Sequence, residues 1–254
     1  MNTLERASIE KAGNEHGWEN VISSTDSGVT LASARHRAQV TITKHHNHAA
    51  WDVALPSGLI QQELARSFPR FRDTDGRFAA IDMDQLVALL RRAADLAQSL
   101  PNQAAITYRE RVRKALASIP PNGTEVERMV KQRVGQDTFR EALMDYWGGA
   151  CAVTGIDVPE VLRASHAKPW ADCATDDERL DVFNGLLLAA NLDALFDRGF
   201  ITFDSSGRLT ISARLSVPQR ASLRLSEEMR LRWIAPEHEA YLSWHRDHLF
   251  CSTR

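Results

Sequence analysis

Apolar positions recur at two different spacings along the first 100 residues. Spacings of three and four, as on one face of a helix, predict helices at residues 2–16, 59–68 and 83–100. Strict alternation of apolar and polar positions predicts strands at residues 28–31, 38–43 and 51–55. Residues 1–100 are therefore expected to form a small α+β domain. Its role is open between a packing or dimerisation module and a recognition domain, and the pattern reveals no ligand for it.

A polar, arginine-bearing helix is expected to link this domain to the rest of the chain over residues 101–123. It ends at Pro120-Pro121-Asn122-Gly123, which is the clearest boundary signal in the sequence. Residues 124–254 form the second expected domain. Its pattern predicts helices before Trp147, a hairpin about a Ser-Ser-Gly turn, and helices at residues 227–231 and 237–250. The expected fold class is α+β.

Composition and charge narrow the functional classes. The 254 residues are enough for two modest domains, and 43% hydrophobic and 25% charged residues are typical of a globular protein. A net charge of −2 argues against a generally basic nucleic-acid-binding surface, so any DNA binding must come from local patches. The sequence shows no signal peptide and no apolar run of about 20 residues, which predicts a cytoplasmic protein with no membrane partner.

Cysteine and histidine clusters give little support for a zinc site. Cys151, Cys173 and Cys251 are scattered and form no CxxC pair, which argues against a structural zinc and favours a reduced compartment. The histidines between His45 and His48 lie at an expected hairpin tip. Adjacent side chains of a strand point to opposite faces, so a solvated loop is favoured there over a metal site.

Two aspartates carry the first chemical signal. Asp193 and Asp197 are four residues apart, and such residues lie on one face of a helix. A helix that Asn191 caps and Gly199 ends would present both carboxylates to one cation. The plainer alternative is that Asp193 is a first-turn acid that the helix dipole favours, and that Asp197 pairs with Arg198.

A histidine and an asparagine complete the set. His166 lies in a turn before Lys168-Pro169, and an imidazole that titrates near pH 6.5 can accept a proton at neutral pH. Asn184 closes an apolar segment and can add a neutral oxygen to the cation site, although Asn-Gly is also a favoured turn pair. Together these residues form the parts of a one-metal phosphodiesterase site.

The segment 151–203 resembles the bacterial branch of the HNH nuclease superfamily. The resemblance rests on CAVTG at 151–155, SHAKPW at 165–170, NGLLL at 184–188 and LDALFDRG at 192–199. It implies a ββα-metal fold, in which a hairpin and a helix hold one divalent ion, within a nuclease domain at residues 124–254. It also implies a DNA endonuclease that leaves 5′-phosphate and 3′-hydroxyl ends. Relatives of this kind tend to act in restriction or phage defence, so a homodimer or a defence-system partner protein is a further expectation.

The resemblance assigns roles residue by residue. His166 matches the general base, and Asn184 matches the central asparagine, which in relatives either binds the metal or braces the loop that holds the base. Asp193 stands where many relatives have the final histidine, and Asp197 matches the acidic or histidine position one helical turn later. His166 and Asn184 are thus the expected catalytic residues, and Asp193, Asp197 and Asn184 the expected metal ligands.

Two departures from the family pattern change the expected chemistry. Ser165 stands where an acid or histidine often precedes the base, and Asp193 replaces a histidine. Carboxylate and amide oxygens suit magnesium and manganese better than zinc, so we expect one Mg²⁺ or Mn²⁺ per site. The same departures leave open a DNA-binding or interaction module whose nuclease site has decayed. A nuclease directed at RNA is a third alternative.

Basic and polar side chains near this segment are candidate DNA contacts. Arg133, Gln136 and Arg140 lie on the helix before it, although a charge run is usually a solvated face. Lys168 follows the candidate base, and Arg198 follows the aspartates. These five residues are the expected DNA-binding set.

Overall fold

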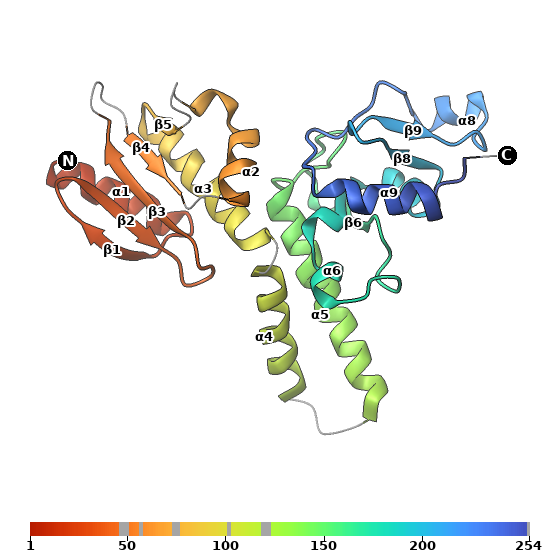
Figure 1. The fold of residues 1–254 in the computed structure, drawn as a ribbon, viewed down its shortest axis with the longest axis horizontal. Helices are drawn as coiled ribbons and strands as arrows, with labels where there is room; N and C mark the ends of the chain where they lie inside the picture. The colour runs from red at the N-terminus through yellow and green to blue at the C-terminus, as the bar shows by residue number, and fades with distance from the viewer. Residues whose placement is uncertain (46–50, 56–57, 73–76, 101–102, 118–122, 253–254) are drawn as a thin grey trace. The chain divides into compact units, whose positions relative to one another are not determined.

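The computed structural model describes residues 1–45, 51–55, 58–72, 77–100, 103–117 and 123–252, and it is a mixed α and β structure (Figure 1). The chain divides into two compact units, Met1–Leu100 and Pro101–Arg254. Across the ranges just given, no helix is long and apolar enough to span a membrane.

The first unit is built on an antiparallel sheet. Its described strands follow one another in the order β1 (Asn20–Ser24), β2 (Gly28–Ala32), β3 (Gln39–Lys44), β4 (Trp51–Ala54) and β5 (Phe78–Ala80). The helices are α1 (Thr3–Glu15), α2 (Leu59–Ser67) and α3 (Met83–Ser99), with a 3₁₀ turn η1 (Pro69–Phe71) after α2. Helices α1 and α3 contact the sheet and each other, and α2 packs on α3. The predicted helices and the strands at 28–31, 38–43 and 51–55 are confirmed to within a few residues.

Alternation along the strands sets the core of this unit. Val29, Leu31, Val40 and Ile42 are fully buried, while the threonines between them are partly exposed. Strands β1 and β5 were not predicted. All five residues of β1 are exposed and β5 has only three residues, so neither gives a clear alternation of burial in the sequence.

The histidine cluster is only partly described. His45 contacts the carboxylate of Asp52 through Nδ1 at 2.7 Å, across the β3–β4 pair. His46 to His48 lie outside the described residues.

The second unit begins with two helices that lie side by side (Figure 1). They are α4 (Gln103–Ala117) and α5 (Gly123–Tyr146). An ion pair of 2.7 Å between Arg111 and Glu141 joins them. The helix that was expected as a linker therefore lies against α5 within the second unit.

The central segment of this unit is a hairpin followed by a helix. Strand β6 (Leu162–His166) pairs antiparallel with β7 (Gly185–Ala189), so that His166 lies opposite Gly185, and α7 (Ala190–Asp197) follows β7 directly. Short turns flank or interrupt the pair: η2 (Pro159–Val161) before β6, and α6 (Asp176–Arg179) and η3 (Val182–Asn184) between the strands. A Cβ at Gly185 would collide with the side chains of Phe139 and Leu143, so glycine here allows α5 to pack on the hairpin.

Two local predictions for this segment were wrong. His166 is the last residue of β6 and does not lie in a turn. Asn191 is not the N-cap of α7, because the helix begins at Ala190, with Ala189 at the cap position. Strand β7 runs into α7 without a connecting residue, so Asn191 already lies inside the first turn.

The rest of the second unit follows α7 in the sequence, and β8 contacts α7. The predicted hairpin is confirmed as β8 (Ile201–Phe203) with β9 (Leu209–Ile211), and two helices follow, α8 (Val217–Ser222) and α9 (His238–His248). The predicted helix at residues 227–231 was wrong. Backbone hydrogen bonding extends the hairpin there, since Leu209 N donates to Met229 O and Arg208 bridges to Arg230. The short α8 was missed, although Ser216 and Gln219 form a capping box at its start.

The fold predicts a specific cost at Gly199, which ends α7. Its φ is +68°, and an added Cβ would collide with the carbonyl oxygen of Leu249. We expect Gly199→Ala to lower the free energy of unfolding by about 3 kcal/mol, as the sum of backbone strain and steric overlap. Urea unfolding of the full chain measures it.

The matched control is Gly155→Ala. Gly155 has a similar φ of +72°, but nothing lies within 4 Å of an added Cβ. This variant should show only the backbone strain of about 1 kcal/mol. Equal losses of unfolding free energy in the two variants would contradict the packing of Leu249 against Gly199.

Candidate active site

The end of β6 directs two neighbouring side chains to opposite sides of the hairpin. Ser165 faces α7, where its hydroxyl donates a hydrogen bond to Oδ1 of Asp193. His166, the next residue, faces α5, where its ring stacks on Phe139. This follows from the strand, whose successive side chains alternate between its faces. Both helices therefore contribute to the site.

The oxygen-bearing side of the site consists of Ser165, Asp193 and Asp197. Asp193 lies in the first turn of α7 and Asp197 is its last residue. Burial and the neighbouring charge of Asp193 raise the pKa of Asp197 to about 6, although Arg198 opposes the shift. Repulsion between the two carboxylates therefore contributes to the shift, after the larger effect of burial. The structure thus brings together the two predicted acidic ligands and adds the Ser165 hydroxyl.

The imidazole of His166 is held in one tautomer. Its Nε2 donates to the carbonyl oxygen of Arg179 at 2.8 Å, so the proton of the neutral ring resides on Nε2 and Nδ1 carries the free lone pair. The ring centroid is 3.8 Å from that of Phe139 and 6.0 Å from that of Trp170. Burial lowers the pKa of His166 to about 4, and the bond to Arg179 only partly offsets the effect. The imidazole is therefore neutral at pH 7.

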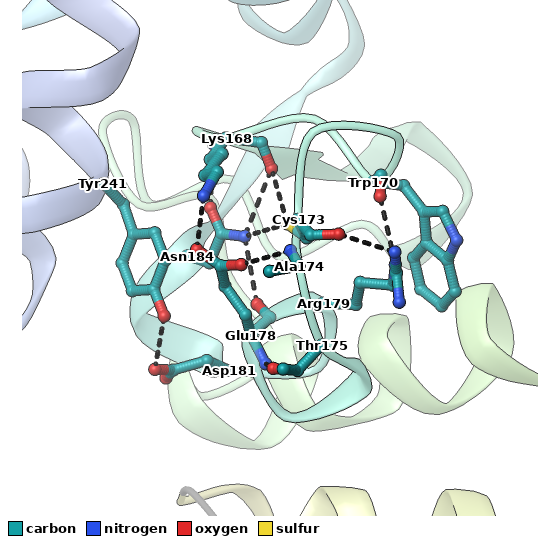
Figure 2. A network of polar contacts seen from close by, with 10 residues as sticks. All are labelled: Lys168, Trp170, Cys173, Ala174, Thr175, Glu178, Arg179, Asp181, Asn184 and Tyr241. Carbon is teal, nitrogen blue, oxygen red and sulfur yellow. Dashed lines mark hydrogen bonds and ion pairs between the residues drawn. The ribbon is translucent and has the colours of Figure 1, made fainter.

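The side chain of Asn184 is fully buried and bonds to the loop between β6 and β7 (Figure 2). Its Oδ1 accepts from Lys168 N at 2.8 Å. Its Nδ2 donates to Lys168 O at 3.2 Å, to Glu178 O at 3.1 Å and to Cys173 Sγ at 3.3 Å. Of the two roles considered for this residue, these contacts are those of a loop brace.

Charged side chains inside this loop also bond to the loop itself. Lys168 Nζ pairs with Glu178 Oε1 at 2.6 Å, and Glu178 Oε2 accepts from Ala174 N. Arg179 donates to the carbonyls of Trp170 and Cys173, and its guanidinium lies over the Trp170 ring (Figure 2). The ammonium of Lys168, a predicted phosphate contact, is thus engaged in an ion pair.

Sequence reasoning missed the roles of Glu178 and Arg179. A signal for the first was present, because Thr175 and Glu178 have the spacing of a capping box, and Thr175 Oγ1 accepts from Glu178 N. The carbonyl of Arg179, which fixes the tautomer of His166, leaves no signature in the sequence, since every residue carries a carbonyl.

The other predicted DNA contacts divide into two kinds. Arg133, Gln136 and Arg198 have exposed side chains. Arg140 donates to the carbonyl oxygens of Leu162, at 2.7 Å, and Pro159, at 2.8 Å, and so holds the segment that leads into β6. Its guanidinium is therefore already occupied in the folded protein.

The donor set fits a hard divalent cation. Among the residues that the structure describes, His, Cys, Asp and Glu side chains form no group of three or more that could hold a metal. Two carboxylates and a hydroxyl supply only oxygen. Mg²⁺ is commonly held by one or two carboxylates while it keeps several waters, so Ser165, Asp193 and Asp197 suit Mg²⁺ or Mn²⁺.

The hairpin β6–β7, whose second strand runs directly into the carboxylate-bearing helix α7, has the ββα order that the sequence resemblance predicts. In agreement, residues 151–204 match the family model described as HNH endonuclease, which confirms the resemblance of this segment. The C-terminal region therefore carries an HNH domain, and such a domain indicates nuclease activity on DNA. A search of curated proteins found no match to the chain.

The contacts of Asn184 predict a loss of stability that does not depend on metal. We expect Asn184→Ala to lower the free energy of unfolding by about 2–4 kcal/mol in EDTA, because partly buried backbone groups of Lys168 and Glu178 lose their partners. Urea unfolding measures this loss.

Asp197→Asn is the matched control for that measurement. The amide removes the charge that Asp193 repels, so this variant should be at least as stable as the wild type in EDTA. An Asn184→Ala protein as stable as the wild type in EDTA would rule out the bracing role.

Proposed function

We propose that the protein is a cytoplasmic, metal-dependent DNA endonuclease that hydrolyses phosphodiester bonds with His166 as its general base. The observation that carries the proposal is the hydrogen bond from His166 Nε2 to the Arg179 carbonyl. It keeps the proton on Nε2, so Nδ1 is the nitrogen that can accept a proton from water. Ser165, the residue before His166 on β6, lies with the oxygen-bearing side chains of α7, because its hydroxyl donates to Asp193.

The proposed cation site consists of Asp193 and Asp197, with the Ser165 hydroxyl as a neutral neighbour. A divalent cation, Mg²⁺ or Mn²⁺, bound there would stabilise the negative charge that develops on the phosphate and on the leaving oxygen. Asn184 is assigned a bracing role, because its amide is already committed to the loop.

The proposed transfer of a proton from the attacking water uses groups of this chain alone. Nδ1 of His166 takes a proton from the attacking water, whose oxygen forms the new bond to phosphorus. The imidazolium that results is stabilised by the Arg179 carbonyl, which still accepts from Nε2. The bond from phosphorus to the 3′ oxygen breaks, and this oxygen takes a proton from solvent water, which leaves a 5′-phosphate and a 3′-hydroxyl, as the family resemblance implies.

Exposed residues of the second unit are the proposed contacts to DNA. Arg133, Gln136 and Arg198 retain this role, since their side chains are exposed. Residues 1–100 are proposed as a separate domain that recognises the substrate or a partner, and the family resemblance suggests restriction or phage defence as the setting.

Removal of the base tests the proposal directly. We expect His166→Ala to slow plasmid cleavage at least 100-fold in Mg²⁺ or Mn²⁺, and EDTA to abolish cleavage by the wild type. Agarose gels resolve nicked and linear products. The control is His248→Ala, which removes an exposed imidazole of α9 and should cut at the wild-type rate.

If His166→Ala cuts as fast as the wild type, another group is the base. If the wild type leaves both plasmid DNA and RNA intact with Mg²⁺ and with Mn²⁺, the alternative of a decayed DNA-binding module replaces the proposed activity.

Binding of the cation has a readout that is separate from cleavage. Mg²⁺ should raise the Tm of the wild type, because a ligand that binds only the folded state stabilises it. The double variant Asp193→Asn/Asp197→Asn should lose this shift, whereas Asp157→Asn, which changes an exposed acid elsewhere in the unit, should keep it. Differential scanning fluorimetry measures all three. A shift that persists in the double variant would place the ion elsewhere.

A further inference from the structure

A hydrogen bond joins α9 to the loop that follows the candidate base, between β6 and β7. Tyr241 of α9 donates from its hydroxyl to Oδ2 of Asp181 at 2.9 Å (Figure 2). Tyr241 lies outside the segment 151–204 that matches the HNH family model. The contact therefore ties a residue beyond the matched segment to the interior of the site.

Asp181 transmits this contact to the turn that contains Asn184. Its Oδ1 accepts from Phe183 N at 2.9 Å, and its carbonyl oxygen accepts from Asn184 N at 2.9 Å, so Asp181 caps the turn η3. Burial raises the pKa of Asp181, although its bonds to Phe183 and Tyr241 oppose the shift. Without the tyrosine hydroxyl, Oδ2 of a largely buried carboxyl group would lose its protein donor, which is a costly arrangement.

Asn184 bonds to the backbone beside His166 and to the backbone beside Arg179, whose carbonyl the imidazole contacts. Its carbonyl oxygen accepts from Ala167 N at 2.9 Å, directly after the histidine. Its Nδ2 donates to Glu178 O at 3.1 Å, directly before Arg179, whose carbonyl accepts from the imidazole. One asparagine thus fixes both the backbone that carries the base and the backbone that sets its tautomer.

We propose that Tyr241 is a positioning residue for His166, acting through Asp181 and Asn184. The inference rests on the proposed role of His166 as the base. It assigns α9 to the active unit, so the functional domain extends well beyond the segment that matches the family. Tyr241 itself takes no part in the reaction. Its hydroxyl holds the turn η3, and η3 holds the loop.

The variant Tyr241→Phe removes only the hydroxyl, and Ser243→Ala is its control. Ser243 lies on the same helix, but its hydroxyl donates to the exposed Asp247 and not to the loop. We expect Tyr241→Phe to lower kcat for plasmid cleavage about tenfold with KM unchanged, because a displaced base slows the chemical step more than it weakens substrate binding. Ser243→Ala should match the wild type in both constants.

A second readout does not depend on activity. In the full chain labelled with ¹⁵N-histidine and kept in EDTA at pH 8, the His166 resonances, assigned with His166→Ala, should show a proton on Nε2 and none on Nδ1. Tyr241→Phe should shift these resonances or mix the two tautomers, whereas Ser243→Ala should leave them in place. A role in folding alone would change the Tm without changing this tautomer pattern.

A double-mutant comparison tests the route. In the Asp181→Ala background, Tyr241→Phe should cause no further loss of kcat and no further change in the His166 resonances, because the acceptor is already gone. Additive effects would show that Tyr241 acts by another route and would overturn the proposal.

The outcomes separate this inference from the proposed function. Wild-type kcat and an unchanged His166 spectrum in Tyr241→Phe would overturn the positioning role while leaving the nuclease intact. If the wild type cuts no nucleic acid, the nuclease proposal fails, and the His166 spectrum still decides whether Tyr241 orients the imidazole.

Discussion

The buried amide of Asn184 is the interaction on which the site depends. A fully buried amide must find its partners within the protein, because an unsatisfied polar group in the interior costs more than a made hydrogen bond gains. Here the partners come from Lys168, Cys173 and Glu178, at separate positions in one long loop. The amide can be satisfied only when these groups converge, so a single side chain selects one conformation of a segment that has little regular structure of its own.

The loop alone does not make the site, because the side chains of Ser165 and His166 leave the strand in opposite directions. Each needs a helix to complete its surroundings. Helix α7 supplies the carboxylates, and α5 supplies the ring of Phe139. Close approach of α5 depends on glycine at two positions: a Cβ at Gly135 would collide with Trp170, and one at Gly185 with Phe139. Helix α5, whose sequence suggests a DNA-binding surface, thus also covers the imidazole of His166. This burial lowers the pKa of His166.

What the sequence could predict follows from the range of each interaction. The spacing of Asp193 and Asp197 is a local property of a helix, and the alternation in β2 and β3 is local to a strand, so both could be predicted from the sequence. The role of Arg140 was not, because a guanidinium bonded to the Leu162 and Pro159 carbonyls has the same sequence signature as one that faces phosphate. The bond from Tyr241 to Asp181 was equally hidden, since it joins residues 60 positions apart and Tyr241 lies outside the segment that matches the family.

The position of α7 explains why the two carboxylates stay close despite their repulsion. Its first residue continues β7 without a linker, so the N-terminal end cannot swing away from the hairpin. Near its C-terminal end, the buried His245 stacks on Phe196 and donates from Nε2 to the Phe196 carbonyl at 3.0 Å. Because both ends are anchored, the helix cannot shift to separate the carboxylates, and their repulsion adds to the effect of burial in raising the pKa of Asp197. The contacts of β7 and His245 therefore hold Asp193 and Asp197 on one fixed helix, where the proposed cation would bind them.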